Sequence, residues 1–341
     1  MPDMFAWYAD SFDPRLASIR YRVLEPMAGL RAAGVPIERY DPEKGPAAYR
    51  AVIFCKSQTP TGLAALRSVK AAGGRVIYDL CDNVFAAHEA GHASAARVTH
   101  FVAMLREADA LTFSTAMLKT QIEERVESLP ADRVVIPDTL DTDQPDASQP
   151  SWTARLALTR LDHFLKRHQG ALHAIWFGNT MGRLSGYVHV ARAVEHLAIF
   201  SRSCPVTLTV MSNHRLGYYH QARRWPIPHH YVGWNLEIAR AVLARHRVAV
   251  IPVEGNDYTA GKTLNRPATA LLEGLAVVSD AIPSYGELAD FITLGDWQAG
   301  LAENAEWSAT AQARVAKGAA HLRRHYNRDA VAQRWRVMLG A

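Results

Sequence analysis

The sequence predicts an α/β protein made of two Rossmann-like domains that face a cleft, and two observations support this prediction. Short apolar runs alternate with helical stretches along most of the 341 residues, as in parallel sheets built from βαβ units. The alternation is interrupted once, at residues 138–151 (DTLDTDQPDASQPS), which are rich in Asp, Pro, Ser and Thr and lack apolar periodicity. We therefore expect an N-terminal domain over residues 1–145 and a C-terminal domain over residues 146–341.

The first half contains six short stretches that we expect to be strands of one sheet. They lie at residues 4–8, 35–40, 51–55, 75–80, 110–114 and 134–137. The helices expected between them cover residues 20–33, 61–72, the region up to residue 108, and 115–128. Glycines directly after the first two helices, at Gly34 and Gly73, are normal signals for a helix C-terminus.

The second half repeats this order of elements. Strands are expected at residues 173–177, 206–211, 248–252 and 275–279, and helices at 152–168, 187–200, 236–245 and between the last two strands. Residues 310–339 form a helical tail with an approximate apolar stripe surrounded by arginines. We expect the tail helices to pack back toward the N-terminal domain and their arginines to form a solvated face.

The composition is that of an ordinary globular protein with a mild excess of positive charge. The formal net charge of +5 suits an anionic substrate, an anionic membrane surface or nucleic acid, and decides among none of them. The three cysteines (Cys55, Cys81 and Cys204) show no metal-ligand spacing, so we expect reduced thiols. No signal peptide and no apolar run of membrane-spanning length is evident. We therefore expect a cytoplasmic protein, with peripheral contact to the inner membrane left open.

A phosphate-binding site is predicted between the last two expected strands. The helix that joins them carries Lys262, Asn265 and Arg266 at its start, with Pro267 in the first turn, where its missing N–H has no intrahelical partner. In parallel sheets, ligands bind beyond the carboxyl ends of the strands, where loops meet helix N-termini. Lys262 and Arg266, four residues apart at such a place, suit a phosphate or a diphosphate.

Two more loops at strand ends provide candidates for the same ligand. The loop after the expected strand 173–177 contains Gly178 and Arg183 among further glycines, which let the backbone approach an anion closely. The loop after the expected strand 275–279 carries side chains suited to contact a sugar or a ribose, namely Ser284, Tyr285 and Glu287.

Five segments together resemble the GT-B glycosyltransferases and, within them, family 4 (the group 1 type). The resemblance spans most of the chain. Each segment alone is a weak signal, and the resemblance is more specific because all five occur in the family's order and spacing. The segments are SIRYR (18–22) with Leu30 and Gly34, LTFSTAML (111–118), VVIPDTLD (134–141), IWFGNTMGR (175–183) and GLAVV (274–278).

The resemblance implies a metal-independent glycosyltransferase whose co-substrate is a nucleotide diphosphate sugar, with no further cofactor. The implied acceptor is a saccharide or a lipid-linked glycan, contacted in the N-terminal domain by Arg20, Arg22 and His88. The donor is expected in the C-terminal domain, on Lys262, Arg266, Asn265, Arg183, Gly178, Ser284, Tyr285 and Glu287.

Acidic residues at the end of the expected strand 75–80 are candidates for the catalytic base. An inverting transfer needs a carboxylate or a histidine near the acceptor hydroxyl. Asp82 is the first candidate and Asp79 the second, because both should face the cleft. Structural roles remain an equal alternative for this group of residues, either as loop caps or as partners of Arg20 or Arg22.

The sequence departs from the family at two glutamates that usually stand eight residues apart on the donor helix. The corresponding positions here are Gly261 and Thr269. The family's usual retaining mechanism is therefore not carried over, and the stereochemical outcome stays open. The missing acids favour one alternative, a nucleotide-binding GT-B protein that has lost catalysis. The positive charge alone raises another, a glycosyltransferase that modifies DNA.

A competing motif lies at residues 88–92, where HEAGH matches the H-E-x-x-H pattern of zinc peptidases. In that class two histidines four apart on a helix bind zinc and the glutamate activates water. Gly91 interrupts the helix here and no third ligand is placed downstream, so a metallopeptidase is kept only as an alternative. His88 is expected instead on a helix near the cleft.

Overall fold

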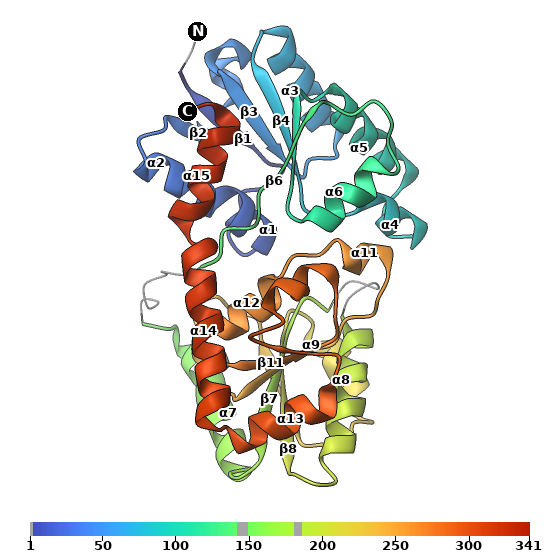
Figure 1. Cartoon of the computed structure of the whole chain (residues 1–341), viewed down its shortest axis with the longest axis vertical. Helices are drawn as coiled ribbons and strands as arrows, with labels where there is room; N and C mark the ends of the chain where they lie inside the picture. The colour runs from blue at the N-terminus through green and yellow to red at the C-terminus, as the bar shows by residue number, and fades with distance from the viewer. Residues whose placement is uncertain (1–2, 142–148, 181–185) are drawn as a thin grey trace. The chain divides into compact units, whose positions relative to one another are not determined.

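The computed structural model describes residues 3–141, 149–180 and 186–341, and the chain divides into two compact units (Figure 1). Unit 1 consists of Met1–Thr142, Asn256–Thr263 and Arg324–Ala341, and unit 2 of Asp143–Gly255 and Leu264–Arg323. Each unit contains a parallel sheet of six strands flanked by helices, which confirms the predicted α/β class. None of the helices in the described part of the chain is long and apolar enough to cross a membrane.

The sheet of unit 1 has the strand order β2-β1-β3-β4-β5-β6. Its strands are β1 (Phe5–Tyr8), β2 (Ile37–Arg39), β3 (Ala51–Cys55), β4 (Arg75–Leu80), β5 (Ala110–Phe113) and β6 (Asp132–Val135). A continuous helical stretch follows β1, made of α1 (Ala17–Ile19), a π-helical turn (Arg20–Leu24) and α2 (Glu25–Ala32). The other α-helices are α3 (Pro60–Ala71), α4 (Val84–Glu89), α5 (Ala95–Glu107), α6 (Ala116–Glu123), α11 (Asp257–Ala260) and α15 (Arg328–Leu339).

Two hydrophobic clusters cover the two faces of this sheet. Alternate residues of one strand point to opposite faces, so Val52 and Phe54 of β3 lie in one cluster and Ile53 lies in the other. The second cluster includes α15, whose Trp335 ring lies 5.0 Å from the ring of Trp7 on β1. The last helix of the chain therefore belongs to the core of unit 1.

The sheet of unit 2 has the strand order β12-β11-β10-β7-β8-β9. Its strands are β7 (Leu172–Gly178), β8 (Val206–Ser212), β9 (His229–Gly233), β10 (Val248–Ile251), β11 (Ala276–Ser279) and β12 (Thr293–Leu294). The helices are α7 (Trp152–Arg167), α8 (Tyr187–Phe200), α9 (Arg215–Ala222), α10 (Ala239–Leu243), α12 (Asn265–Leu272), the 3-10 helix η4 (Pro283–Leu288), α13 (Trp297–Glu306) and α14 (Ala309–His325).

Both sheets contain a point where the strand order reverses direction. In unit 1 it lies between β1 and β3, and in unit 2 between β7 and β10. The loops leaving two such neighbouring strands run to opposite faces of the sheet, which opens a crevice at their carboxyl ends. Ligand sites are therefore expected at the carboxyl ends of the strands, which we call the carboxyl edge of each sheet, at these two reversal points.

The elements agree with the sequence prediction wherever apolar runs are long. The predicted strands 51–55 and 75–80 and the predicted helix 187–200 have the bounds expected. The elements that were not predicted include the helices α9, α11 and α13 and the strands β9 and β12. The short piece 256–263 also differs from the expected layout, because its contacts place it in unit 1 although the chain on both sides of it belongs to unit 2.

Candidate functional site

The carboxyl edge of unit 1 contains a buried ion pair. Asp79 at the end of β4 is fully buried, and Arg22, also buried, donates Nε–H to its Oδ2 at 3.0 Å and forms an ion pair with its Oδ1. Asp138 adds a second carboxylate 3.2 Å from Nη1 of Arg22. Burial alone would lower the pKa of Arg22, but the two carboxylates raise it above its ordinary value.

This arrangement is the structural alternative that the sequence left open for Asp79. Thr112 donates its hydroxyl to Oδ1 of Asp79 at 2.6 Å, so both carboxylate oxygens have partners. Arg20 is likewise engaged, donating Nε–H to Asp141 at 2.9 Å and Nη1–H to the carbonyl of Pro14 at 2.7 Å. The expectation that Asp79 faces an acceptor is wrong, because its side chain has no solvent exposure.

Asp82, two residues beyond β4, lies between two lysines. Lys56, directly after β3, and Lys262 both form ion pairs with its carboxylate, and the Asp82 side chain is 14% exposed. Burial alone would raise the pKa of Asp82, but the ammonium groups of Lys262 and Lys56 hold it well below its usual range. Asp82 is therefore a permanent anion and a weak base.

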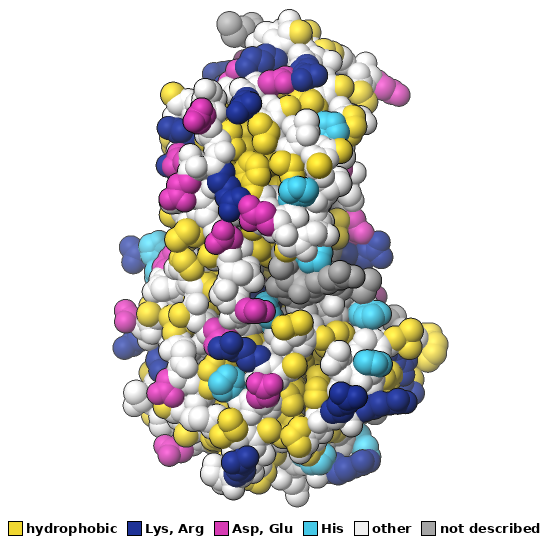
Figure 2. Space-filling view, turned by 90° about the vertical axis from the view of Figure 1, so that its right-hand side faces the viewer, with side chains coloured by type: hydrophobic (Ala, Val, Ile, Leu, Met, Phe, Trp, Pro, Cys, Tyr) yellow, Lys and Arg dark blue, Asp and Glu magenta, His cyan; other side chains and the backbone are white. Residues whose placement is uncertain are grey.

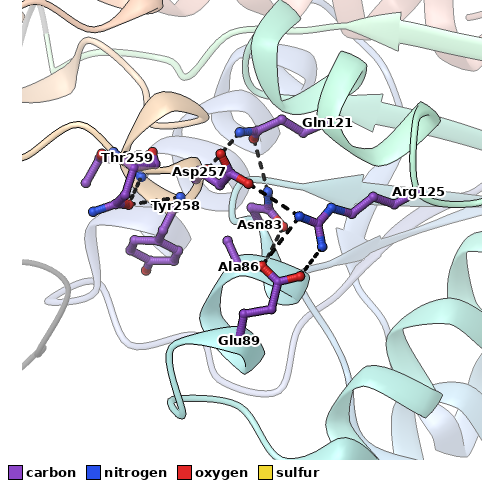
Figure 3. Close-up of polar contacts among 9 residues, drawn as sticks. Asn83, Ala86, Glu89, Gln121, Arg125, Asp257, Tyr258 and Thr259 are labelled. Atoms are coloured by element: carbon purple, nitrogen blue, oxygen red, sulfur yellow. Dashed lines mark hydrogen bonds and ion pairs between the residues drawn. The ribbon is translucent and has the colours of Figure 1, made fainter.

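Lys262 reaches Asp82 because the segment 256–263 is fixed on unit 1 by contacts with α4 and α6 (Figure 3). Gln121 of α6 donates to the carbonyl of Asp257 at 2.8 Å, and Arg125 lies 3.3 Å from its carboxylate while pairing with Glu89 of α4. Asn256 and Thr259 close a capping box at the start of α11. Lys262 thus precedes α12 and is not on that helix, contrary to the sequence prediction.

The remaining unit 1 candidates have local structural partners. Asn83, which follows Asp82, caps α4 by accepting a hydrogen bond from the amide of Ala86 at 3.1 Å. His88, exposed at the end of α4, has its Nδ1 2.6 Å from the carbonyl of Ala93.

The zinc-peptidase alternative is wrong in its geometry. Helix α4 ends at Glu89, and Gly91 takes a φ of 74°, so His88 and His92 do not lie on one helix. The carboxylate of Glu89 forms an ion pair with Arg125. Within the described residues no group of three or more His, Cys, Asp or Glu side chains could hold a metal ion.

The carboxyl edge of unit 2 brings together Gly178 and Arg266, two of the residues predicted to bind the sugar donor. Gly178 ends β7, and a Cβ placed on it would lie 3.7 Å from Cζ of Arg266 and 3.3 Å from the ring of Trp176. Arg266 lies in the first turn of α12, with its guanidinium 5.8 Å from the centre of the Trp176 ring. Its Nη1 is buried and has no hydrogen-bond partner in the described chain.

A histidine that the sequence analysis missed lies on the other side of this edge. His189, in the first turn of α8, is 2% exposed, and its Nε2 accepts a hydrogen bond from the amide of Glu254 at 3.3 Å. Its Nδ1 is buried, again without a partner among the residues described. Burial and the charge of Arg266 lower the pKa of His189 despite the nearby Glu254 and Asp280.

Asp280, after β11, holds the loops of this edge together. It accepts from the amide of Val253 at 2.9 Å and from the indole N–H of Trp297 at 2.9 Å, and Arg192 of α8 lies 3.1 Å from it. The loop after β10, which contains Glu254, is therefore anchored to the loop after β11. The edge is preorganised rather than loose.

The other residues of unit 2 that were predicted to bind the sugar donor differ in burial and in their partners. Ser284 lies on η4 with its hydroxyl oxygen buried and unpartnered in the described chain. Tyr285 is buried beside it, and the exposed Glu287 has Oε1 3.0 Å from Nε2 of His321. Asn265 is the first residue of α12. Arg183 lies outside the described residues.

The missed residues gave only weak sequence signals. Lys56 directly follows an apolar strand, and it takes a left-handed φ of 57°, which is rare for a residue with a side chain. His189 stands between valines in an apolar helical stretch and reads as a core position. Its place in the first turn after a strand-end loop was the one available clue.

The molecular surface gives no support to the nucleic-acid alternative on the face that Figure 2 shows. There Lys and Arg side chains are scattered among Asp, Glu and hydrophobic groups over both units, rather than gathered in one broad basic field. Binding along a nucleic-acid backbone depends on such a field.

Comparison with known proteins shows similarity at the level of structure. No protein-family model and no curated protein matches the sequence. Among solved structures, the chain is similar to Anabaena HepE in complex with UDP and with UDP and glucose, over 100% of both chains, with 14% and 13% identity and TM-scores of 0.66 and 0.67.

Two further structures give a similar result over less of their length. S. aureus TarM matches at 9% identity and a TM-score of 0.60, over 85% of this chain and 55% of TarM. The UDP-forming trehalose-phosphate synthase of Burkholderia xenovorans matches at 12% identity and a TM-score of 0.60, over 94% and 78% of the two chains. At such identities the likeness concerns the fold, and the chain has the α/β fold with two Rossmann-like domains of the GT-B glycosyltransferases, as the sequence predicted.

Proposed function

We propose that this protein is a glycosyltransferase that moves a sugar from a nucleotide diphosphate sugar to a saccharide or lipid-linked acceptor, and that unit 2 holds the donor. The observation that supports this most directly is Arg266. Its Nη1 is a buried donor that has no partner among the described residues, at the point where the strand order of the sheet reverses. Leaving such a group unsatisfied is costly unless a ligand supplies the acceptor.

The chemistry of this edge suits a diphosphate. A guanidinium presents several N–H groups in a plane that matches phosphate oxygens, and Arg266 stands in the first turn of α12, where free amides and the helix dipole also favour an anion. Gly178 leaves room beside it. Fixed positive charge at this place stabilises the negative charge that develops on the departing nucleotide. The similar HepE structures were solved with UDP, which makes UDP the first ligand to test.

The reaction is proposed to need no metal ion, because the arginine and the helix terminus supply the positive charge at the leaving group. Full transfer activity in the presence of EDTA would support this, and loss of activity that is restored by a divalent cation would contradict it.

Calorimetric titration of the full chain with UDP, ADP and GDP tests the donor site. At least one nucleotide should bind, and Arg266→Ala should weaken that binding about 30-fold or more, the usual cost of truncating one partner of a buried charged contact. Arg202→Ala is the matched control, because Arg202 is an exposed arginine of unit 2 outside the site. The assignment fails if no nucleotide binds at millimolar concentration or if Arg266→Ala binds as the wild type does.

Lys262 remains a predicted diphosphate ligand, although its ammonium group pairs with Asp82. Lys262→Ala in the same titration separates the two roles. A loss of nucleotide affinity would support the diphosphate contact, whereas a loss of stability alone would limit Lys262 to its ion pair.

A catalytically inactive nucleotide-binding protein is the second candidate. The state of Asp82 favours it, because a carboxylate held between two ammonium groups is a poor general base. Incubation with UDP-glucose and a panel of saccharide and lipid-linked acceptors separates the candidates: transfer or donor hydrolysis supports the enzyme, and nucleotide binding without either supports the inactive binder. Co-flotation with vesicles tests the proposed peripheral membrane contact in parallel.

A further inference from the structure

His189 differs from an ordinary buried histidine in how its two ring nitrogens are used. Its Nε2 accepts from the backbone amide of Glu254 at 3.3 Å, while its Nδ1 is buried without a partner in the described chain. The ring belongs to the first turn of α8, and the amide to the loop that leaves β10. The Glu254 amide therefore holds the Nε2 side of the ring, and the Nδ1 side has no partner in the part of the chain that the structure describes.

The contact with Glu254 determines which nitrogen carries the proton. A backbone amide can only donate, so Nε2 must be bare, and in a neutral imidazole the proton then sits on Nδ1. Burial and the positive charge of Arg266 lower the pKa of His189, while Glu254 and Asp280 act in the opposite direction and Arg192 adds to the lowering. The neutral ring with Nδ1–H is therefore the form present near neutral pH.

Nδ1–H of His189 and Nη1–H of Arg266 are consequently two buried donors at this edge without an acceptor among the described residues, and the Trp176 indole N–H and the Ser284 hydroxyl are buried without a partner there as well. A single unsatisfied donor can be a packing defect. Two such donors at the same strand-order reversal point instead to one ligand that supplies acceptors to both. Both need an oxygen acceptor, and an anion with several oxygens suits a neutral and a cationic donor at once.

We propose that His189 donates its Nδ1–H to the diphosphate of the nucleotide sugar, with the Glu254 amide holding the ring in the required tautomer. This inference rests on the proposed function and adds a positioning residue to it. No proton is transferred: the hydrogen bond to the diphosphate strengthens as negative charge grows on the departing nucleotide.

Two substitutions separate the two nitrogens. In His189→Gln the side-chain amide reaches as far as Nε2, so its oxygen can still accept from Glu254 while the donor at the Nδ1 position is gone. In His189→Asn the shorter amide reaches only the Nδ1 position, so a donor remains there while the Glu254 amide loses its acceptor.

The expected results for the two variants are opposite. His189→Gln should unfold near the wild-type temperature and bind both UDP and pyrophosphate about tenfold more weakly, the usual loss for a hydrogen bond to a charged group. His189→Asn should keep UDP affinity within about threefold and unfold at a lower temperature, because a buried amide is left unsatisfied.

Nitrogen NMR of the full chain with 15N-labelled histidine provides a readout that does not depend on the variants. The His189 signals should show a protonated Nδ1 and a bare Nε2 in the free protein, and the Nδ1 signal should move on saturation with UDP. Arg202→Ala is again the control for nonspecific effects.

Each contrary outcome is distinct. The inference is overturned if His189→Gln binds UDP as the wild type does, if both variants lose affinity equally, if only UDP and not pyrophosphate is affected, or if the proton is on Nε2. In these cases the proposed function survives as long as wild-type binding is lost in Arg266→Ala. If the wild-type protein binds no nucleotide, the proposed function and this inference fall together.

Discussion

The carboxyl edges of the two sheets have the same architecture and opposite chemistry. In unit 1 the charged side chains satisfy one another: Arg22 pairs with Asp79 and Asp138, and Asp82 pairs with two lysines. In unit 2 the donors at the reversal point, on Arg266 and His189, are buried without partners in the described chain.

This difference shows where a ligand is needed. Buried polar groups are nearly always paired, so a folded chain that leaves two donors unpaired at a crevice is less stable there than it could be. At the carboxyl edge of unit 1, Arg22, Asp79 and Asp82 avoid that cost through ion pairs. At the carboxyl edge of unit 2 the cost of the unsatisfied donors remains, which is typical of a binding site whose ligand supplies the missing acceptors.

The largest effect that can test this contrast is expected from Arg22→Met. Removal of the guanidinium leaves the Asp79 carboxylate buried without a counter-ion, and the usual cost of breaking such a pair is about 3–5 kcal/mol of the free energy of unfolding. Urea unfolding at neutral pH measures it. Nucleotide affinity of the folded fraction should be unchanged, and a selective loss of affinity at normal stability would place Arg22 in the binding site instead.

Asp82→Asn should have a smaller effect, about 1–3 kcal/mol, because both lysine side chains are about one-third exposed and solvent screens them. The pKa of Asp82 is lower in the folded state than in the unfolded state. Its stabilisation is therefore fully present above about pH 4, the ordinary aspartate value, and is lost as the pH falls toward the folded-state value.

Unfolding free energies measured from pH 7 down to pH 3 check this dependence. The difference between wild type and Asp82→Asn should shrink with falling pH. Asp290→Asn, at an exposed position, is the matched control. A pH-independent difference would mean that the ion pairs do not contribute.

Asn83→Ala is expected to have the smallest effect, about 1 kcal/mol, because it removes the N-terminal cap of α4. Asn83→Asp keeps a capping oxygen and should recover most of the loss in thermal unfolding. If alanine at this position leaves stability intact but abolishes transfer, Asn83 acts in catalysis rather than as a cap.

Much of the fold could be predicted because its strands are apolar throughout. Parallel strands covered on both faces give continuous runs such as AVIFC at β3, which periodicity detects directly. The strand β9 (HHYVG) has two histidines and a tyrosine in place of such a run, and it escaped prediction. The attachment of residues 256–263 to unit 1 depends on contacts with Gln121 and Thr115, far away in sequence, which no local pattern reports.

The site could be predicted only in part, for a related reason. Arg266 and Gly178 stand out locally, as a cation at a helix start and a glycine after a strand. His189 becomes informative only when Glu254 donates to it across the sheet edge. Asp79 looked catalytic from its position after a strand, and only its pairing with Arg22 showed a structural role. The two carboxyl edges differ in which side chains, distant in sequence, contact one another, and residue type alone does not reveal these contacts.

The most direct test of this contrast is the thermal unfolding of Arg266→Met with and without UDP. The account predicts that without nucleotide the variant is as stable as the wild type to within about 1 kcal/mol, because an unsatisfied buried donor is replaced by an apolar group of similar length. It also predicts that UDP stabilises the wild type and that the variant needs about 30-fold more UDP for the same stabilisation. A variant that loses about 2 kcal/mol or more without nucleotide, yet is stabilised by UDP at the same concentrations as the wild type, would show that Arg266 holds the fold together and that the ligand binds elsewhere.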